Sequence, residues 1–301
     1  MFPDHLDLKL LKIVRSNVDN TVKYIFLSRG QIVEFSYINK KDGKDIICAP
    51  TQTSCNLGCK FCFLSDYDLV VRNLTPEEIL FPVKYIVHDL GLLVRPHHNN
   101  VLLISFMGCG EPLLNIKNVV ETCNRIINEF KENYGVVRFA VASLIPKIKL
   151  MRDFTEAVKK NAIPLKFHLS LHSPDPGVRK EIMPSADQIS ESIEMVKLFM
   201  SSTGNSAEIH YSLIDGINDR EEDVAMLTKL LMGQGIPVKF LSYNEKPSLD
   251  FECSERVDYF RETLECEGVE TEFYIPPGID IGSSCGQFLM EYYEQYNKCK
   301  S

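Results

Sequence analysis

From residue 73 onward the sequence alternates between strand-like and helix-like segments, and this alternation restricts the fold more than any other feature. Apolar runs typical of strands occur at residues 101–106, 136–142, 165–171, 209–213, 238–241 and 271–275. Helix patterns begin at Thr75-Pro76-Glu77-Glu78, a helix-start signal, and continue at 116–132, 149–160, 188–199, 219–232, 254–265 and 287–296. Such alternation is typical of βαβ units around a parallel sheet. About six units predict an α/β fold of the open or partial barrel type.

The first 47 residues have a different pattern. Strand-like runs at 22–28 and 31–38 flank Arg29-Gly30 and predict a β-hairpin, and a polar turn at 40–44 leads into a third run at 45–49. We therefore expect a short β-rich extension at 1–47 and a barrel at 48–301. Functional groups of parallel sheets lie at the carboxyl ends of strands. Chemistry is expected in the loops after Ala49, Phe106, Ala142, Leu171, Leu241 and Ile275.

Charge and cysteine usage narrow the class of protein. Residues 1–5 have no basic segment leading into an apolar block, and no apolar run reaches the roughly 18 residues of a membrane span, so we expect a cytoplasmic protein without a membrane partner. Ten cysteines are then expected to be thiols, metal ligands or redox groups. The net charge of −8 argues against a broad electrostatic grip on nucleic acid.

Three of the cysteines form a compact motif. Cys55, Cys59 and Cys62 follow a C-x3-C-x2-C pattern in a loop after a strand. A four-iron cluster held by three cysteines leaves one iron open to a substrate or cofactor. The alternative is a zinc site completed by a distant His or Cys. The sequence predicts only structural roles for five other cysteines: Cys109, Cys123, Cys253, Cys266 and Cys299.

This motif, with Phe61 before its third cysteine, resembles that of the radical S-adenosylmethionine (radical SAM) superfamily, and Met107-Gly108-Cys109-Gly110-Glu111-Pro112 resembles that family's Gly-Glu-Pro motif. The resemblance implies a partial (β/α)6 barrel, a [4Fe-4S] cluster on Cys55, Cys59 and Cys62, and S-adenosylmethionine cleaved to a 5′-deoxyadenosyl radical. Further stretches are similar to the RlmN/Cfr-type adenosine methyltransferases. They are residues 48–55, 72–75, 107–115, 169–172, 215–219 and 284–287.

The closer resemblance implies roles for individual residues. Cys285 would accept a methyl group from one S-adenosylmethionine and, after a radical abstracts hydrogen from it, add the methylene group to an amidine carbon of adenine. Cys48 would resolve that adduct, leaving a Cys48–Cys285 disulfide. Glu34 resembles the family's acid/base glutamate if the 40–44 turn has one extra residue. The residues similar to S-adenosylmethionine contacts are Gly110, Glu111, Ser143, Ser170, His172 and Asn244.

Taken alone, these residues allow plainer interpretations. Cys285 precedes the final helix, and a helix start favours a thiolate, but a free cysteine is most often a small buried apolar residue. Cys48 in a strand before proline is typical of a core residue. His172 alternates with apolar residues and is typical of a core histidine, whereas Glu34 is typical of an exposed strand position and Asn244 of a loop cap.

Three departures from the relatives concern the acceptor. About 20 residues precede the first expected strand, too few for the relatives' helical accessory domain. Their Arg-Gly segment before the reactive cysteine is replaced by residues 273–278, which contain no arginine, and residues 252–272 hold eight acidic and two basic residues. Their serine-rich strand end is reduced to Ser143.

The sequence therefore leaves the function open between several hypotheses. The first is methylation of adenine in RNA, with RNA and a flavodoxin- or ferredoxin-like electron donor as partners. The second is the same cysteine-tethered chemistry on a small or otherwise non-RNA molecule. A third is a radical enzyme that only abstracts hydrogen, with Cys285 structural. The fourth is a metal-binding scaffold or electron carrier built on the three motif cysteines.

Overall fold

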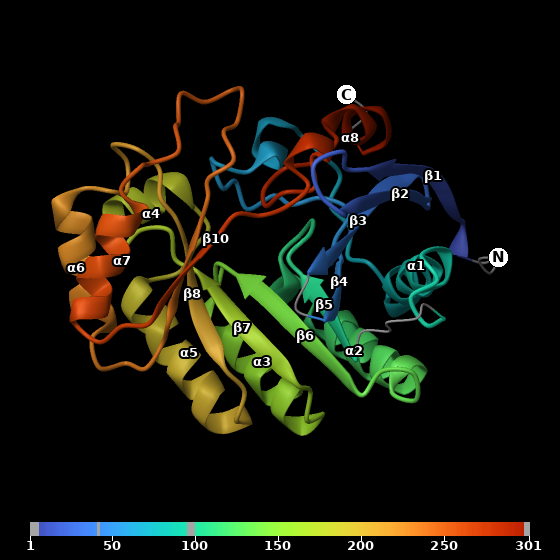
Figure 1. The fold of residues 1–301 in the computed structure, drawn as a ribbon, viewed down its shortest axis with the longest axis horizontal. Coiled ribbons are helices and arrows are strands. Elements are labelled where there is room, and N and C mark those ends of the chain that lie inside the picture. The colour runs from blue at the N-terminus through green and yellow to red at the C-terminus, as the bar shows by residue number, and fades with distance from the viewer. Residues whose placement is uncertain (1–5, 41–42, 95–99, 298–301) are drawn as a thin grey trace.

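The structure, a computed structural model, describes residues 6–40, 43–94 and 100–297. Ten strands form one sheet in which every strand pairs with its neighbours in chain order (Figure 1). The strands are β1 (Leu8–Arg15), β2 (Val22–Ser28), β3 (Gln31–Lys40), β4 (Lys44–Cys48), β5 (Val101–Phe106), β6 (Val136–Ser143), β7 (Leu165–Ser170), β8 (Ala207–Ser212), β9 (Val238–Leu241) and β10 (Thr271–Tyr274).

Strands β1 to β4 are antiparallel, and every pair from β4 to β10 is parallel. The curved parallel part is the expected partial (β/α)6 barrel, and its six crossovers contain the helices α1 (Pro76–Asp89), α2 (Ile116–Phe130), α3 (Ile148–Lys160), α4 (Pro176–Ile182), α5 (Ile189–Thr203), α6 (Glu221–Leu231) and α7 (Val257–Cys266). The last helix, α8 (Met290–Tyr296), follows β10. Among the described residues no helix combines the length and apolar character that a membrane span requires.

The β-rich extension contains the expected hairpin and one unexpected strand. Arg29 (φ +49°) and Gly30 (φ +76°) both lie in the left-handed region, which the tight turn between β2 and β3 requires. Strand β1 was missed because its sequence, LKLLKIVR, mixes lysines with apolar residues without alternating. Since β4 pairs with both β3 and β5, the extension continues directly into the barrel sheet, and the boundary at residue 47 stays a prediction.

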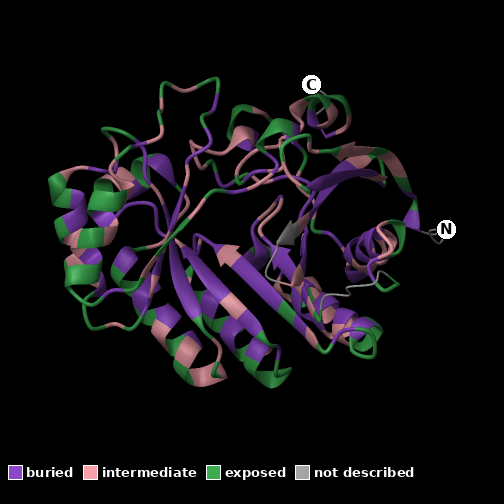
Figure 2. Ribbon diagram, viewed as in Figure 1, coloured by how far each residue is buried: buried purple, intermediate pink, exposed green. Residues whose placement is uncertain are grey.

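The helices pack their apolar faces on the outside of the barrel and expose their other faces (Figure 2). Helix α1 begins as expected, with Thr75 and Glu78 in a reciprocal capping box. Helix α6 begins after Arg220, one residue later than expected. Asp219 does not cap it because its carboxylate accepts hydrogen bonds from Gly216 N–H and Ser254 Oγ.

The C-terminal segment crosses back from β10 to the first strands, so α8 lies beside β3 (Figure 1). Asn297 holds the C-terminal segment in this position: its Oδ1 accepts from Ile32 N–H at 2.6 Å, and its Nδ2 donates to Thr53 O at 2.7 Å. The final segment is thereby joined both to β3 and to the loop that carries the motif cysteines. Cys299 lies outside the described residues, as do residues 1–5, from which the absence of a signal was inferred.

Candidate active site

The three motif cysteines lie in the loop between β4 and α1, at the carboxyl end of the barrel. Burial raises the pKa of all three thiols, that of Cys55 to about 12, and repulsion from Cys62 raises the pKa of Cys55 and Cys59 further. The loop is folded tightly, because Cys62 N–H donates to Cys59 O at 3.0 Å and Lys60 N–H donates to Ile182 O at 2.8 Å. One loop thus presents three soft sulfur donors toward a shared space.

The donor set suits an iron–sulfur cluster better than a single ion. The ligands of one ion lie close together, yet the three sulfur atoms are not all within 4.8 Å of one another. A four-iron cluster holds its thiolates farther apart. Two cations also face the loop and oppose the rise in thiol pKa: Arg179 acts on Cys59 and Lys246 on Cys62. A cluster bound by three thiolates carries negative charge, so this placement is favourable.

Arg179 and Lys246 are anchored, which fixes their charges beside the loop. Buried Arg179, on α4, donates to the carbonyls of Ser170 at 2.8 Å, Leu171 at 2.5 Å and Leu144 at 3.0 Å. Buried Lys246, after β9, donates to Lys60 O at 3.0 Å and Asp66 Oδ1 at 2.6 Å. Sequence reasoning missed both residues. Their partners are mostly backbone carbonyls distant in the chain, so no local motif marks them.

Glu111 follows β5 and is buried at the carboxyl end of the barrel, where the cysteine loop also lies. It accepts hydrogen bonds from Leu113 N–H at 2.9 Å and Leu144 N–H at 3.4 Å, but burial dominates and raises the pKa of Glu111 to about 7. Gly110 precedes it with φ +98°, and a Cβ there would lie 2.6 Å from Gln52 Cβ. Only glycine fits at that close approach, and the turn places the Glu111 carboxylate near the cysteine loop, where its charge raises the pKa of Cys55 and Cys59.

Ser143 and His172 lie at the carboxyl ends of β6 and β7, on the same side of the barrel as Glu111. Ser143 Oγ accepts from Ile145 N–H at 2.9 Å and bonds to Glu111. Buried His172 has φ +53°, and its Nδ1 accepts from Ser212 N–H at 3.0 Å. Burial lowers the pKa of His172 to about 3, so the ring is neutral and its proton lies on Nε2. The ring packs 4.9 Å from that of Phe61 in the cysteine loop.

Cys48 and Cys285 line one cavity of about 820 Å³, together with Met107 and Tyr274. Both are free thiols, so the disulfide that the resemblance implies is not present in this structure. Desolvation by the surrounding protein raises the pKa of Cys48 to about 12 and that of Cys285 to about 11, although Cys285 as a whole residue is exposed. The expectation that a helix start activates Cys285 is wrong, because α8 begins only at Met290. The cation that lowers the Cys285 pKa is Lys239.

The loop around Cys285 accepts two hydrogen bonds from Asn244, which follows β9. Asn244 Nδ2 donates to Ser284 Oγ at 2.9 Å and to Cys285 O at 2.8 Å. The amide of Asn244 thus holds the loop that carries Cys285 in this structure. Its role as a cofactor contact stays a prediction.

Glu34 is buried beside the same loop, in contrast to the exposed position typical of a strand glutamate. Its Oε2 pairs with Lys23 Nζ at 2.5 Å, and its Oε1 accepts from Leu289 N–H at 3.1 Å. Lys23 also donates to Gly282 O at 2.5 Å, so the buried pair joins the two ends of the loop. Glu34 and Cys48 both line a small cavity of about 30 Å³. The acid/base role of Glu34 stays a prediction.

The other described cysteines lie apart from this chemistry or fill space beside it. Cys123 is fully buried in α2, Cys266 is exposed at the end of α7, and Cys253 bonds weakly to Ser242 at 3.8 Å. Cys109 is buried in an apolar cluster with Tyr293.

Fold and site together define a radical SAM enzyme. A model of the radical SAM superfamily matches residues 50–228. A radical SAM methyltransferase from Sphaerobacter thermophilus superposes with a TM-score of 0.82 at 25% identity, covering 94% of this chain and 81% of that one. Streptococcus suis SuiB bound to S-adenosylmethionine shares the fold alone, with a TM-score of 0.52 at 15% identity over 77% of this chain and 50% of SuiB.

Sequence relatives narrow the assignment. Proteins described as probable dual-specificity RNA methyltransferase RlmN, from Clostridium botulinum (strain Loch Maree / Type A3) and Clostridioides difficile (strain 630), are each 33% identical. The alignments cover 94% and 96% of this chain and 80% and 81% of those proteins. The chain belongs to the RlmN-type family of radical SAM methyltransferases. It is an enzyme whose cofactors are a [4Fe-4S] cluster and S-adenosylmethionine, which rules out the scaffold hypothesis.

Proposed function

We propose that this enzyme carries the methyl group on Cys285 and delivers it to an amidine carbon of adenine. The observation that supports this most directly is the cavity that Cys285 and Cys48 both line. These two cysteines lie at the carboxyl ends of the strands, where the motif cysteines and Glu111 also lie. Cys55, Cys59 and Cys62 would hold the cluster, which would supply the electron for cleavage of S-adenosylmethionine to a 5′-deoxyadenosyl radical. A flavodoxin- or ferredoxin-like protein is the proposed electron donor.

The remaining roles belong to side chains of this chain. Gly110, Glu111, Ser143, Ser170 and His172 would hold S-adenosylmethionine: the Glu111 carboxylate would accept from its ammonium group, and His172 Nε2–H would donate to one of its oxygen atoms. Desolvation raises the Cys285 pKa to about 11, and the Lys239 ammonium opposes this rise, so Lys239 would favour the thiolate that methyl transfer needs.

Methyl transfer from S-adenosylmethionine to the Cys285 thiolate would form an S–CH3 bond and release S-adenosylhomocysteine. Loss of one hydrogen atom to the 5′-deoxyadenosyl radical would give 5′-deoxyadenosine and an S–CH2 radical, which adds to the acceptor carbon. The adduct then gives up one electron, for which the oxidised cluster would be the acceptor, and the acceptor carbon loses its proton. Attack of the Cys48 thiolate on the Sγ of Cys285 breaks the C–S bond, whose electron pair takes up a proton to complete the new methyl group, and the two sulfurs end as a disulfide. The free thiols of the described chain are consistent with the starting state and with a reducing, cytoplasmic setting.

RNA is the first candidate acceptor, because the relatives carry the name of RNA methyltransferases. A small-molecule acceptor is the second candidate, and the charge near Cys285 favours it. Residues 273–278 bring no arginine to the reactive loop, and the preceding residues 252–272 carry eight acidic and two basic side chains. Such a segment repels a phosphate backbone.

The test is intact-mass analysis of protein made with its cluster, followed by peptide mapping around Cys285. A methyl or methylene adduct on Cys285, absent from Cys285→Ala, is the expected result. An unmodified Cys285 after anaerobic incubation with S-adenosylmethionine would favour the hydrogen-abstracting hypothesis and overturn this one. Transfer of deuterated methyl from labelled S-adenosylmethionine to RNA, followed by nucleoside digestion, separates the two acceptor classes.

A further inference from the structure

The cavity that contains Cys285 extends through the barrel to its opposite end. At the carboxyl ends of the strands it is lined by Cys48 and Cys285, and at the amino ends by Lys44 and Lys166. Lys44 and Cys48 are the first and last residues of β4, so this stretch of the cavity is roughly 13 Å long at the usual strand rise. Its volume of about 820 Å³ falls within the range of small-molecule sites.

The charge of this cavity is opposite to that of the chain. Four cationic side chains line it, namely Lys44, Arg138, Lys166 and Lys239, against the single carboxylate of Glu272. Buried Glu208 behind the wall pairs with Lys166 and Lys239, and Lys239 also pairs with Glu272, in a protein whose net charge is −8. Among the described residues Arg138 pairs with no carboxylate, so its charge is available to a ligand.

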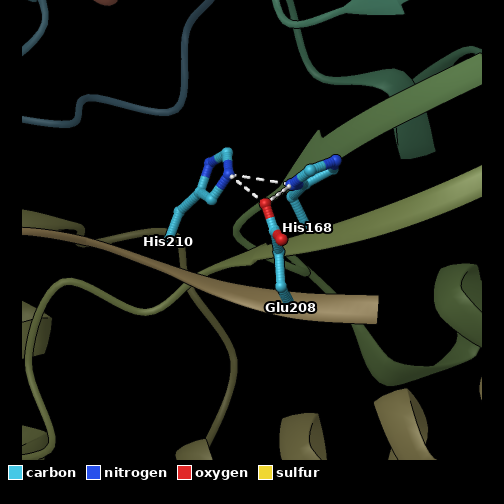
Figure 3. Close-up of side chains that lie close together, drawn as sticks. All are labelled: His168, Glu208 and His210. Atoms are coloured by element: carbon cyan, nitrogen blue, oxygen red, sulfur yellow. Dashed lines mark hydrogen bonds and ion pairs between the residues drawn. The ribbon is translucent and has the colours of Figure 1, made fainter. Parts of the chain in front are cut away.

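A buried cluster of His168, Glu208 and His210 lies on β7 and β8 in the wall of this cavity (Figure 3). His168 Nδ1 lies 2.8 Å from Glu208 Oε1 and 2.8 Å from His210 Nε2, an arrangement that resembles a metal site. However, Lys166 Nζ binds the other oxygen of Glu208, and Lys239 Nζ lies 3.3 Å from Oε1, the oxygen that would bind the ion. The two ammonium groups balance Glu208 without a metal.

The same cluster leaves a hydrogen-bonding atom without a partner. Burial lowers the pKa of His168 to about 3 and also lowers the pKa of His210, so both rings are neutral. His168 is 5% exposed, its ring lines the cavity, and its Nε2 has no hydrogen-bond partner. Buried polar atoms in native proteins are rarely left unpaired. The wall therefore offers a neutral polar contact midway between the reactive cysteine and the basic end.

We propose that the barrel cavity binds a free anionic molecule of nucleotide size, with its phosphate at Arg138 and Lys166 and its acceptor carbon near Cys285. The position of the acceptor carbon near Cys285 rests on the proposed function. The position of the phosphate rests on the cationic residues of the cavity. His168 contacts the middle of the ligand. The acceptor is thus a phosphorylated small molecule, and an RNA strand is the competing outcome.

The test measures binding of adenosine monophosphate and of adenosine to the anaerobic, cluster-loaded enzyme by equilibrium dialysis. We expect adenosine monophosphate to bind at least tenfold more tightly than adenosine. Arg138→Gln disturbs no ion pair of the described chain, and it should weaken binding of the monophosphate about tenfold while leaving adenosine unchanged. Lys160→Gln, an exposed lysine on the outside of α3, is the matched control and should change neither.

Several outcomes would overturn the proposal. Equal binding of the two probes, or no effect of Arg138→Gln, removes the anion site. Displacement of the monophosphate by an RNA hairpin that has no terminal phosphate shows that the cavity binds nucleotides within an RNA strand. If the parent enzyme contains one equivalent of zinc that His210→Ala lacks, the cluster of His168, Glu208 and His210 holds a metal ion. Cys285 methylation, followed by mass in the same samples, separates failure of this inference from failure of the proposed function.

Discussion

Replacing Glu34 by glutamine tests whether the buried pair with Lys23 holds the loop that carries Cys285. The two side chains are 4% and 2% exposed, and Lys23 Nζ lies 2.5 Å from Glu34 Oε2. Glutamine keeps an oxygen that can accept from Leu289 N–H but leaves the Lys23 ammonium buried without a counter-charge. Breaking a buried pair in this way costs about 3–5 kcal/mol, a large part of the roughly 5–15 kcal/mol that stabilises a typical protein.

The assay is urea unfolding of the cluster-loaded protein, followed by circular dichroism under anaerobic conditions. Glu34→Gln should lower the free energy of unfolding by about 3–5 kcal/mol and speed hydrogen exchange in residues 282–289. The double variant Lys23→Met/Glu34→Gln should recover most of the loss, because no buried charge remains. Glu156→Gln, an exposed carboxylate of α3, is the control and should stay within about 0.5 kcal/mol of the parent.

A loss below about 1 kcal/mol would refute this reasoning, as would a double variant less stable than the single one. If Glu34→Gln keeps its stability and the protection of residues 282–289 but loses methyl transfer to the acceptor, Glu34 acts in the chemistry and not as an anchor of the loop.

Three further predictions concern the site. Cys59→Ala should lose the bound iron, seen as loss of the cluster's visible absorption, and retention of full iron content would contradict the three-cysteine assignment. Because the pKa of Glu111 is about 7 and its carboxylate form would bind the ammonium of S-adenosylmethionine, affinity should fall up to tenfold per pH unit below 7, and Glu111→Gln should abolish that dependence. Alkylation of Cys285 by iodoacetamide should rise about tenfold per pH unit up to its pKa of about 11, and Lys239→Met should slow it at every lower pH; unchanged rates would exclude Lys239 from thiolate stabilisation.

The repeating part of the fold was readable from the sequence because its strands are buried apolar runs. Residues 101–106 and 238–241 coincide with β5 and β9 to the residue. Helix α4 was missed, since its seven residues, PGVRKEI, are too few for a helical period. The cysteine motif was equally readable, because its three donors are contiguous. The charged lining of the barrel cavity could not be predicted from the sequence. It consists of single residues from several strands, and only the sheet register brings them together.

The strictly sequential order of the sheet has a consequence for the maturation of the enzyme. Each strand pairs with those made just before and just after it, so the sheet can grow one strand at a time during synthesis. Roughly 220 residues separate Cys62 from Cys285, which corresponds to ~10–45 s of translation. The cysteine loop therefore exists well before α8 and Asn297 return to cover it. Because α8 is made last, we expect the cysteine loop to be most open to an iron donor during that interval, and Cys285, the proposed methyl carrier, is made after every other proposed site residue.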